Sequence, residues 1–346
     1  MVGSHKLARE MVVLGSETWH ISTPIRKKWI SKFSGEYKLR SELSGQVHKV
    51  DGISTYIPQV LSIPHLYKLD RDQVLINSGL PKFDLIIVDQ PAFFISAVRL
   101  KRRTGAQVIF RPTDVFSRID LRILSVFIRR IANFIIATNR KCFSESFYRK
   151  NKKPIYIRPN GVDSRAISHL KSEVTFTGIN KRKLSAVYIG AIDKRVDWNF
   201  LAKLYSTGCF ESIDLFGPSK VAVFESKGIS LCGAVKYRDI SNVLKSYDCA
   251  ILPFRSTRSN SSRSPMKLTE YLLNGLKVIS TPSFVLPEEM KQFEAAVLSF
   301  EQNMNKRDIE KFMSQEIYFI LKDDFKSSFS FESTASLILE LGVGQT

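Results

Sequence analysis

The sequence predicts an α/β protein of two Rossmann-like domains, and three observations support this class. Short, almost wholly apolar runs alternate along the chain with helix-like segments, as in parallel sheets with crossover helices. Several of these runs end at a glycine or a polar residue. In such sheets, ligands bind at the edge formed by the carboxyl ends of the strands. The length of 346 residues suits two domains of ordinary size.

The composition, 44% hydrophobic and 25% charged, is that of a globular chain and excludes a disordered or fibrous one. No run reaches the roughly 18 apolar residues of a membrane span, and the N-terminus lacks a signal-peptide core, so we expect a cytoplasmic location. The cysteines show neither a C-x-x-C pair nor a nearby histidine cluster, so neither a disulfide framework nor a zinc site is indicated. They are Cys142, Cys209, Cys232 and Cys249.

The net charge of +19 lies mostly in the first half of the chain. Residues 1–165 hold 29 Lys and Arg against 13 Asp and Glu, whereas residues 166–346 hold 23 against 20. The electric field of this positive charge favours an anionic partner. Three kinds of partner fit: nucleic acid, an anionic membrane surface or a phosphorylated substrate. Solvated positive surface without a partner is the alternative.

The first domain is expected over residues 1–165. Its first strand is predicted at 11–14, before a small-residue turn, and the segment 23–30 starts like a helix with Pro24 at its first position. The cations and Trp29 of that segment suit either a membrane headgroup layer or an ordinary exposed turn. Further strands are expected at 51–56, 60–63, 84–88, 108–110, 134–137 and 155–157, and helices at 92–103, 121–131 and 141–150.

One carboxylate directly follows a predicted strand of this domain. Asp114 ends the segment Arg111-Pro112-Thr113-Asp114, which comes immediately after the strand 108–110. This location places Asp114 at the carboxyl edge of the sheet, where a reacting group belongs. A helix cap is an equally good interpretation from the local sequence.

The second domain is expected over residues 166–346, after an Asn160-Gly161 turn and a linker at 164–183. Strands are predicted at 186–190, 212–216, 229–233, 249–253 and 278–280, and helices at 198–205 and 240–246. Residues 288–346 are predicted as helices. The last of them, at 332–341, either closes this domain or crosses back to the first.

The stretch 264–280 is the centre of the second domain. Its apolar residues follow helical spacing, Lys267 and Glu270 share the first turn, and Gly275 ends the helix before a strand. A lysine at a helix N-terminus supplements an anion site, most simply for phosphate, and an acid one turn later suits a sugar hydroxyl. A solvated Lys–Glu pair is the alternative.

Ordered motifs carry a resemblance to a known family. The chain has P-N-G-V-D at 159–163, a G-x-x-x-K-R loop at 190–195 and K-L-T-E-Y-x-x-x-G-x-x-V-I at 267–279. In this order they resemble the GT-B glycosyltransferases, which implies two Rossmann-like domains facing a cleft and a nucleotide-sugar donor. T-P-I-R at 23–26, R-P-T-D at 111–114 and S-P-M-K-L-T-E-Y at 264–271 are most similar to the xanthan β-glucuronosyltransferase (GumK-like) family.

The resemblance implies a role for each matching residue. Asp114 corresponds to the general base that takes the acceptor proton. Lys267 corresponds to the cation that neutralises the leaving diphosphate, and Glu270 to the carboxylate that holds the ribose hydroxyls. Met266 and Phe254 would frame the nucleobase, Lys194 and Arg195 would add diphosphate-binding cations, and Ser264 and Arg255 complete the predicted donor set.

The chain also departs from the family pattern. Ser262 stands where retaining enzymes carry a second glutamate, which favours inversion by a single displacement. Ala234 replaces an acidic residue of the xanthan enzyme, which puts identical sugar contacts in doubt, although Arg255 and its neighbours offer a uronate carboxylate a partner. The D-x-D at 70–72 precedes a predicted helix of the first domain, far from Lys267, so we expect no metal.

We therefore expect a glycosyltransferase, with a UDP-sugar as donor and a lipid-linked or glycan acceptor. It would be peripheral at the inner face of the plasma membrane and would serve exopolysaccharide or cell-surface glycan synthesis; its oligomeric state stays open. The alternative is a non-catalytic protein that binds nucleic acid or an anionic surface through its basic half. Dispersed cations and the lack of an RNA-binding aromatic motif argue against nucleic acid. A dehydrogenase would need G-x-G-x-x-G after the first strand, which is absent.

Overall fold

The computed structural model describes residues 3–22, 42–57, 81–113, 115–116, 119–140, 142, 153–162, 173–219, 227–236, 239–257, 266–320 and 329–343. The chain forms two compact units, Met1–Asp163 with Ser330–Thr346 and Ser164–Phe329. The chain leaves unit 1 two residues before the boundary expected at 165, and its last segment belongs to unit 1. The expected basic segment 23–30, the strand 60–63 and most of the helix 141–150 lie outside the described residues.

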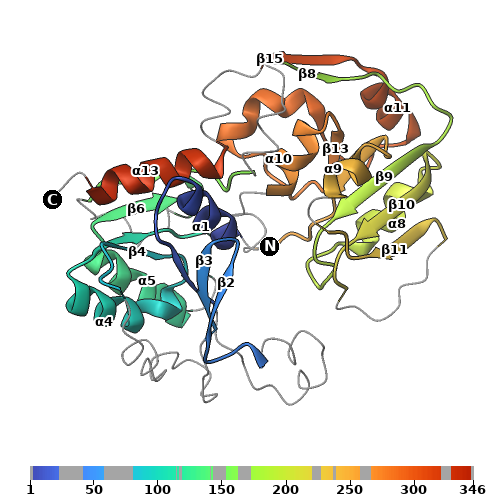
Figure 1. Ribbon diagram of the computed structural model, residues 1–346. Helices are drawn as coiled ribbons and strands as arrows, with labels where there is room; N and C mark the ends of the chain where they lie inside the picture. Colours follow the sequence, from blue (N-terminus) through green and yellow to red (C-terminus); the bar gives the residue numbers. More distant parts are fainter. Residues whose placement is uncertain are drawn as a thin grey trace. The chain divides into compact units, whose positions relative to one another are not determined.

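Unit 1 is organised around a parallel sheet with the order β4-β5-β6-β7. Its helices α4 and α5 cross over between successive strands, and Figure 1 draws them on one side of the sheet, opposite α13. Gly105 ends α4 with φ 75°, and its N–H donates to the carbonyl of Lys101. The elements are β4 (Leu85–Val88), η2 (Pro91–Phe93), α4 (Phe94–Thr104), β5 (Gln107–Phe110), α5 (Ile119–Ile131), β6 (Phe134–Ala137) and β7 (Ile155–Ile157).

The strand predicted at 11–14 is wrong, because most of these residues form the end of helix α1 (Gly3–Val13). Leu7, Ala8 and Met11 follow helical spacing and are buried, and α1 packs against α13 (Phe331–Val343). The chain leaves this helix at Gly15, whose φ is +90°. The strand comes later, as β1 (Trp19–Ile21), which joins β2 (Val47–Val50) and β3 (Ile53–Tyr56) in a small sheet of order β1-β3-β2.

Unit 2 contains a six-stranded parallel sheet with the order β11-β10-β9-β12-β13-β14. Apolar clusters around Leu215 and Leu252 form its core. The strands are β9 (Leu184–Ile189), β10 (Phe210–Phe216), β11 (Ile229–Gly233), β12 (Cys249–Leu252), β13 (Lys277–Ser280) and β14 (Val297–Ser299). The helices are α8 (Trp198–Ser206), α9 (Ile240–Leu244), α10 (Met266–Leu273), η5 (Glu288–Ala296) and α11 (Lys306–Ser314).

Two predictions for this unit are wrong. The expected linker contains β8 (Glu173–Phe176), where Val174 and Phe176 alternate inward and pack against the core. This strand pairs antiparallel with β15 (Ile317–Ile320), so residues 288–346 are not all helical. β14 also lies in that range, because its short apolar run completes the sheet beside β13. Among the described residues, no helix is long and apolar enough to span a bilayer.

Candidate donor site

The strand order of unit 2 reverses beside β9. Numbered from β9, the order is 3-2-1-4-5-6, with β10 on one side of β9 and β12 on the other. Ligands of Rossmann-like sheets bind outside the carboxyl ends of the strands at this switch point. The residues that follow the two strands here are Gly190, after β9, and Pro253-Phe254, after β12.

Lys267 lies at this switch point. It is the second residue of α10, and its ammonium is 5.2 Å from the ring centroid of Tyr188 and 5.6 Å from that of Phe254. Tyr188 belongs to β9, so one cation contacts the ends of both central strands. Aromatic faces attract a cation, so the two rings favour an ammonium at this point. The structure thus brings together two predicted donor-site residues, Lys267 and Phe254, and adds Tyr188.

Two glycines shape the same place. A Cβ on Gly190 would overlap Cε and Nζ of Lys267 and would come within 2.9 Å of the Tyr188 hydroxyl. Gly217, after β10, has φ +147°, and a Cβ there would overlap the carbonyl of Gly190. A side chain at position 217 would therefore collide with the backbone at Gly190, and a side chain at position 190 would displace the Lys267 ammonium. The G-x-x-x-K-R pattern contains Gly190, whereas only the following Pro218, which makes a Gly-Pro turn, draws attention to Gly217.

Tyr271 of α10 forms a hydrogen bond with the end of β9. Its side chain is 1% exposed, and its hydroxyl accepts the N–H of Ile189 at 2.8 Å. Burial raises the pKa of Tyr271 well above its ordinary value, so the hydroxyl stays neutral and able to hold this bond. The helical spacing seen in the stretch 264–280 does not reveal this role of the Tyr271 hydroxyl.

Arg195 is engaged by a carboxylate of its own loop. Its Nε donates to Oδ1 of Asp193 at 2.7 Å, and its Nη2 donates to Oδ2 at 2.6 Å. A diphosphate would have to compete with Asp193 for this guanidinium, so Arg195 is a weaker donor-site candidate than Lys267. Lys194 is exposed on the same loop.

Arg255 links two loops beside the switch point. Its Nε donates to the carbonyl of Val196 at 3.1 Å, and its backbone N–H donates to the carbonyl of Arg195 at 2.9 Å. Phe254 and Val196 form an antiparallel bridge next to these bonds. The structure therefore gives Arg255 a part in holding Phe254 in place, a role that the sequence did not suggest.

The remaining predicted residues lie on α10 or outside the described chain. Met266 is the first residue of α10 and is half-buried, and Glu270 follows one turn later on the same helix. The first N–H groups of a helix lack intrahelical partners and favour an anion, so Lys267 and α10 present their positive ends at one point. Asp114, Ser262, Ser264 and the D-x-D at 70–72 are not among the described residues.

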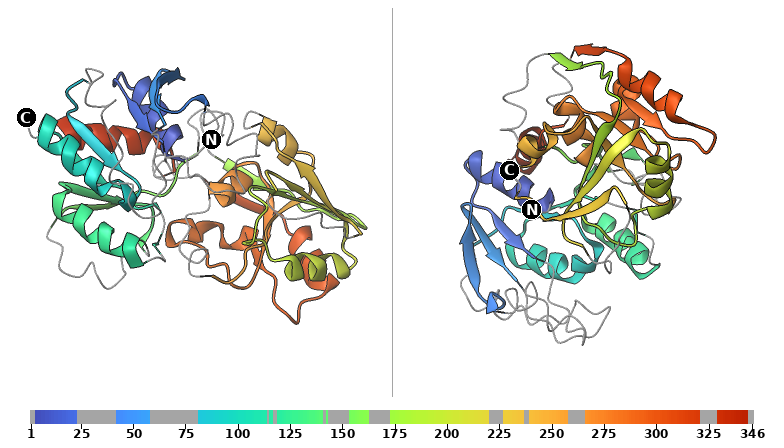
Figure 2. Two further views of the ribbon diagram at one scale, coloured as in Figure 1. Left: turned by 90° about the horizontal axis from the view of Figure 1, so that it is seen from below. Right: turned by 90° about the vertical axis from the view of Figure 1, so that its right-hand side faces the viewer.

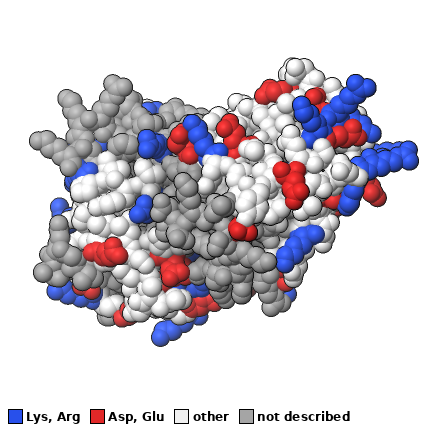
Figure 3. All heavy atoms as spheres, turned by 90° about the horizontal axis from the view of Figure 1, so that it is seen from above, with Lys and Arg blue, Asp and Glu red and all other residues white. Residues whose placement is uncertain are grey.

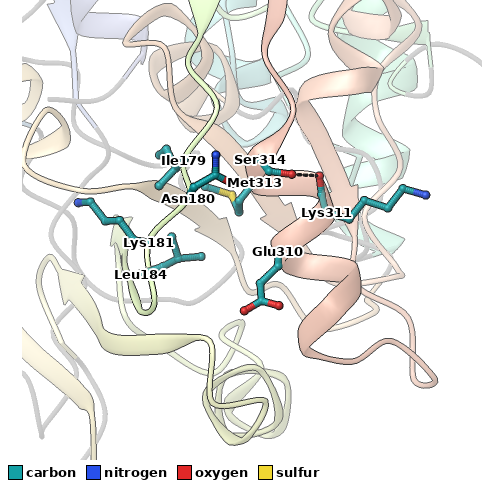
Figure 4. Close-up of a pocket in the computed structure, with 8 residues that line it drawn as sticks. All are labelled: Ile179, Asn180, Lys181, Leu184, Glu310, Lys311, Met313 and Ser314. Carbon is teal, nitrogen blue, oxygen red and sulfur yellow. Dashed lines mark hydrogen bonds between the residues drawn. The ribbon is translucent and has the colours of Figure 1, made fainter.

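A separate cavity of about 380 Å³ lies at the other end of β9. Figure 4 shows its lining, in which residues 179–184 before and at the start of β9 lie near α11. Lys181 at its edge forms an ion pair with Asp248 at 2.7 Å. The cavity shares no residue with the switch point and lies at the amino end of β9, so it is not the donor site. Among the described residues, no group of three His, Cys, Asp or Glu side chains could hold a metal ion.

Two Rossmann-like units, the second with a 3-2-1-4-5-6 sheet, define the GT-B fold. Sucrose-phosphate synthase from Thermosynechococcus elongatus matches with a TM-score of 0.63 at 12% identity, over 98% of this chain and 91% of that one. A glycosyltransferase from Rickettsia africae ESF-5 matches with a TM-score of 0.58 at 14% identity, over 98% and 93%. Anabaena Alr3699/HepE in complex with UDP-glucose matches with a TM-score of 0.57 at 11% identity, over 99% and 92%.

No family model matches the chain, and no curated protein sequence matches it. At these identities the likeness to the solved structures is one of fold. The expected GT-B fold is therefore confirmed, and the GumK-like specificity stays a prediction.

Proposed function

We propose that the protein is a glycosyltransferase that takes its sugar from a UDP-linked donor bound to unit 2. The observation that carries this proposal is the position of Lys267 at the start of α10, between Gly190 and the rings that end β9 and β12. A solved structure of the same fold, Anabaena Alr3699/HepE, is a complex with UDP-glucose, which supports uridine as the nucleoside.

Lys267 acts on the leaving group in this proposal. When the bond between the sugar and the diphosphate breaks, negative charge develops on the diphosphate. An ammonium and a helix N-terminus already aimed at that position stabilise the charge without reorganising. Glu270, one turn further, accepts hydrogen bonds from the ribose hydroxyls. The leaving-group charge is then met by these groups and the nearby arginines, and we propose that no metal is needed.

Asp114 supplies the base. It takes the proton from the acceptor hydroxyl as that oxygen attacks the anomeric carbon, and the anomeric configuration inverts. Ser262 in place of a second glutamate favours this single displacement. Asp114 belongs to unit 1 and Lys267 to unit 2, so one unit supplies the base and the other supplies the cation for the leaving group.

The acceptor is a lipid-linked or glycan substrate presented at the inner face of the plasma membrane. The basic first half of the chain supports this choice, because cations are attracted to an anionic leaflet. The resemblance to GumK-like enzymes makes a uronic acid one candidate for the transferred sugar. A panel of UDP-sugars distinguishes it from a neutral hexose.

The first test is nucleotide binding by isothermal titration calorimetry, with UDP, ADP and GDP and with or without EDTA. We expect UDP to bind without a metal and Lys267→Ala to weaken it about tenfold or more. Lys291→Ala is the matched control, because Lys291 is 60% exposed in the same unit and forms an (i, i+3) ion pair with Glu288 of η5. Indifference of the wild-type protein to every nucleotide would overturn the proposal.

The second test separates the base from the donor site. We expect Asp114→Asn to bind UDP like the wild-type protein and to transfer no sugar. Transfer by this variant would contradict the assignment of the base and leave the donor site standing.

The alternative function, a non-catalytic nucleic-acid or anionic-surface binder, has less support. On the face drawn in Figure 3, the described Lys and Arg side chains lie among acidic ones and form no continuous basic field. Such a binder would bind nucleic acid with steep salt dependence and show no affinity for UDP.

A further inference from the structure

Helix α5 presents an apolar stripe to solvent. Ile119 is 74% exposed, Ile123 52% and Phe127 40%. These residues are four apart, so they lie along one side of the helix. The inward side holds Ser125 and Arg129 together with Ile128, all buried. A surface helix normally buries its apolar face, so this outward stripe marks a contact surface.

The stripe continues onto the neighbouring helix. α4 packs beside α5, as both views in Figure 2 show, and the ring of Phe94 lies 5.6 Å from that of Phe127. The guanidinium of Arg130 lies 5.6 Å from the centroid of the Phe127 ring. The apolar surface thus passes directly into a cation at its C-terminal end.

Both helices end in basic residues at the same place. The last turn of α4 holds Lys101, Arg102 and Arg103, and that of α5 holds Arg129 and Arg130. The Lys101 ammonium donates to the carbonyl of Ile131 at 2.8 Å, which joins the two helix ends. Arg102, Arg103 and Arg130 are exposed.

Lys153 adds a further charge to these helix ends. It donates to the carbonyls of Arg129 and Arg130 at 2.8 and 2.7 Å. Burial, and then repulsion from Lys101 and Arg129, lowers the pKa of Lys153. The lowered pKa thus reflects first the partial burial of this ammonium and then the like charges beside it.

We propose that the α5 stripe (Ile119, Ile123 and Phe127) and the basic helix ends (Arg102, Arg103 and Arg130) dock unit 1 onto an anionic phospholipid bilayer. The apolar side chains enter the boundary between headgroups and acyl chains, and the guanidinium groups meet the lipid phosphates.

Charge selects the bilayer over a second copy of the chain. Two copies carry the same excess of positive charge in this half of the sequence and repel, whereas an anionic leaflet attracts. The surface deepens the membrane-presented acceptor of the proposed function and rests on it, but none of its residues belongs to the donor site.

The test is flotation of the full chain with phosphatidylcholine vesicles, with and without phosphatidylglycerol. We expect the protein to float with the anionic vesicles and added salt to release it. The double variant Ile123→Ser/Phe127→Ser and the triple variant Arg102→Gln/Arg103→Gln/Arg130→Gln should each bind at least about tenfold more weakly. The control Val285→Ser/Tyr318→Ser removes apolar residues of unit 2 that are 60% and 52% exposed, and should bind within about twofold of wild type.

Two further measurements keep the outcome interpretable. UDP titration of each variant checks the fold and keeps a failed membrane test distinct from a failed donor site. Ile123→Trp should show a blue-shifted emission on anionic vesicles, with no loss of fold expected at an exposed position. Unchanged flotation of the Ser variants, equal binding to neutral vesicles, or a dimer that Ile123→Ser/Phe127→Ser dissociates in light scattering would each overturn the proposal.

Discussion

Lys267 occupies the space that any side chain at position 190 would need. The relationship joins the end of β9 to the start of α10 at the switch point of the sheet. We expect Gly190→Ala to push the ammonium away from Tyr188 and Phe254 and to weaken UDP binding about tenfold, because the charge no longer reaches the diphosphate. Isothermal titration calorimetry measures the change.

Gly342→Ala is the control for this substitution. Its new Cβ would lie 3.3 Å from a flexible Leu85 side chain, and alanine favours the helix α13. UDP affinity should then equal that of wild type. If the Gly190→Ala variant bound UDP as tightly as the wild-type protein does, Lys267 would not be the residue that binds the diphosphate.

Lys277 is a buried cation that caps the C-terminal end of helix α11. Its side chain is 2% exposed, and its ammonium donates to the carbonyls of Phe312 and Met313 at 3.0 and 2.8 Å and to that of Gln315. These carbonyls end α11, where a positive charge is favourable. Burial lowers the pKa of Lys277, but the bonds offset this cost.

We expect Lys277→Met to lower the free energy of unfolding by about 3 kcal/mol, because methionine removes a buried charged donor from three carbonyls, of which, among the described residues, only that of Met313 accepts a second donor, the N–H of Ile179. Urea denaturation measures the loss. Lys291→Met, at an exposed position with one ion pair at 3.0 Å, should cost under about 0.5 kcal/mol. Equal costs for the two variants would mean that the bonds of Lys277 contribute nothing.

Arg111 is a fully buried charge of unit 1. Its Nη1 lies 3.8 Å from Oδ1 of Asp89, and its Nη2 donates to Oδ1 of Asn160 at 2.9 Å. These residues follow β5, β4 and β7, so the guanidinium joins three strand ends beside the segment that leads to Asp114. Burial lowers the pKa of Arg111 and raises that of Asp89, and each charge opposes the shift of the other.

We expect Arg111→Met to destabilise unit 1 by about 3–5 kcal/mol, because Asp89 loses its counter-charge. The double variant Arg111→Met/Asp89→Asn should recover part of this loss. Amide hydrogen exchange in β5 and β6 reads the local stability. No recovery in the double variant would indicate that Asp89 is held by other groups.

The sequence predicted best what local patterns decide. Continuous apolar runs such as 134–137 became strands with the expected bounds, because burial on both faces needs such runs. The run at 11–14 misled, because Met11 is buried as part of a helical face that begins at Leu7. β8 was missed because its partner β15 lies far along the chain. A two-stranded pairing of this kind leaves only a weak local signal.

For the proposed donor site, the sequence indicated candidate residues more readily than the contacts between them. Lys267 became a candidate because a lysine at a helix start supplements an anion site. The pairing of Arg195 with Asp193, and the bond from Arg255 to Val196, depend on how two loops fold back on each other. No spacing in the sequence reports such contacts.

His20 makes the stability of unit 1 depend on pH. Its ring lies 5.6 Å from that of His5, its Nε2 is 3.4 Å from Oγ of Ser4, and His5 in turn lies 3.7 Å from Asp51. Burial, and then the positive charge of His5, lowers the pKa of His20 to about 4. The folded protein therefore keeps this ring neutral at pH values where the unfolded chain binds a proton.

The sign of the effect follows from this difference. Above about pH 6.5 neither state is protonated at this ring, and the contribution of His20 to stability is complete. Between about pH 6.5 and 4 the unfolded state takes up the proton first, so the free energy of unfolding falls by up to about 1.4 kcal/mol per pH unit. We expect His20→Gln to flatten this part of the urea-denaturation profile, whereas His48→Gln, in β2, should retain it. An equal slope in both variants would assign the pH dependence to other groups.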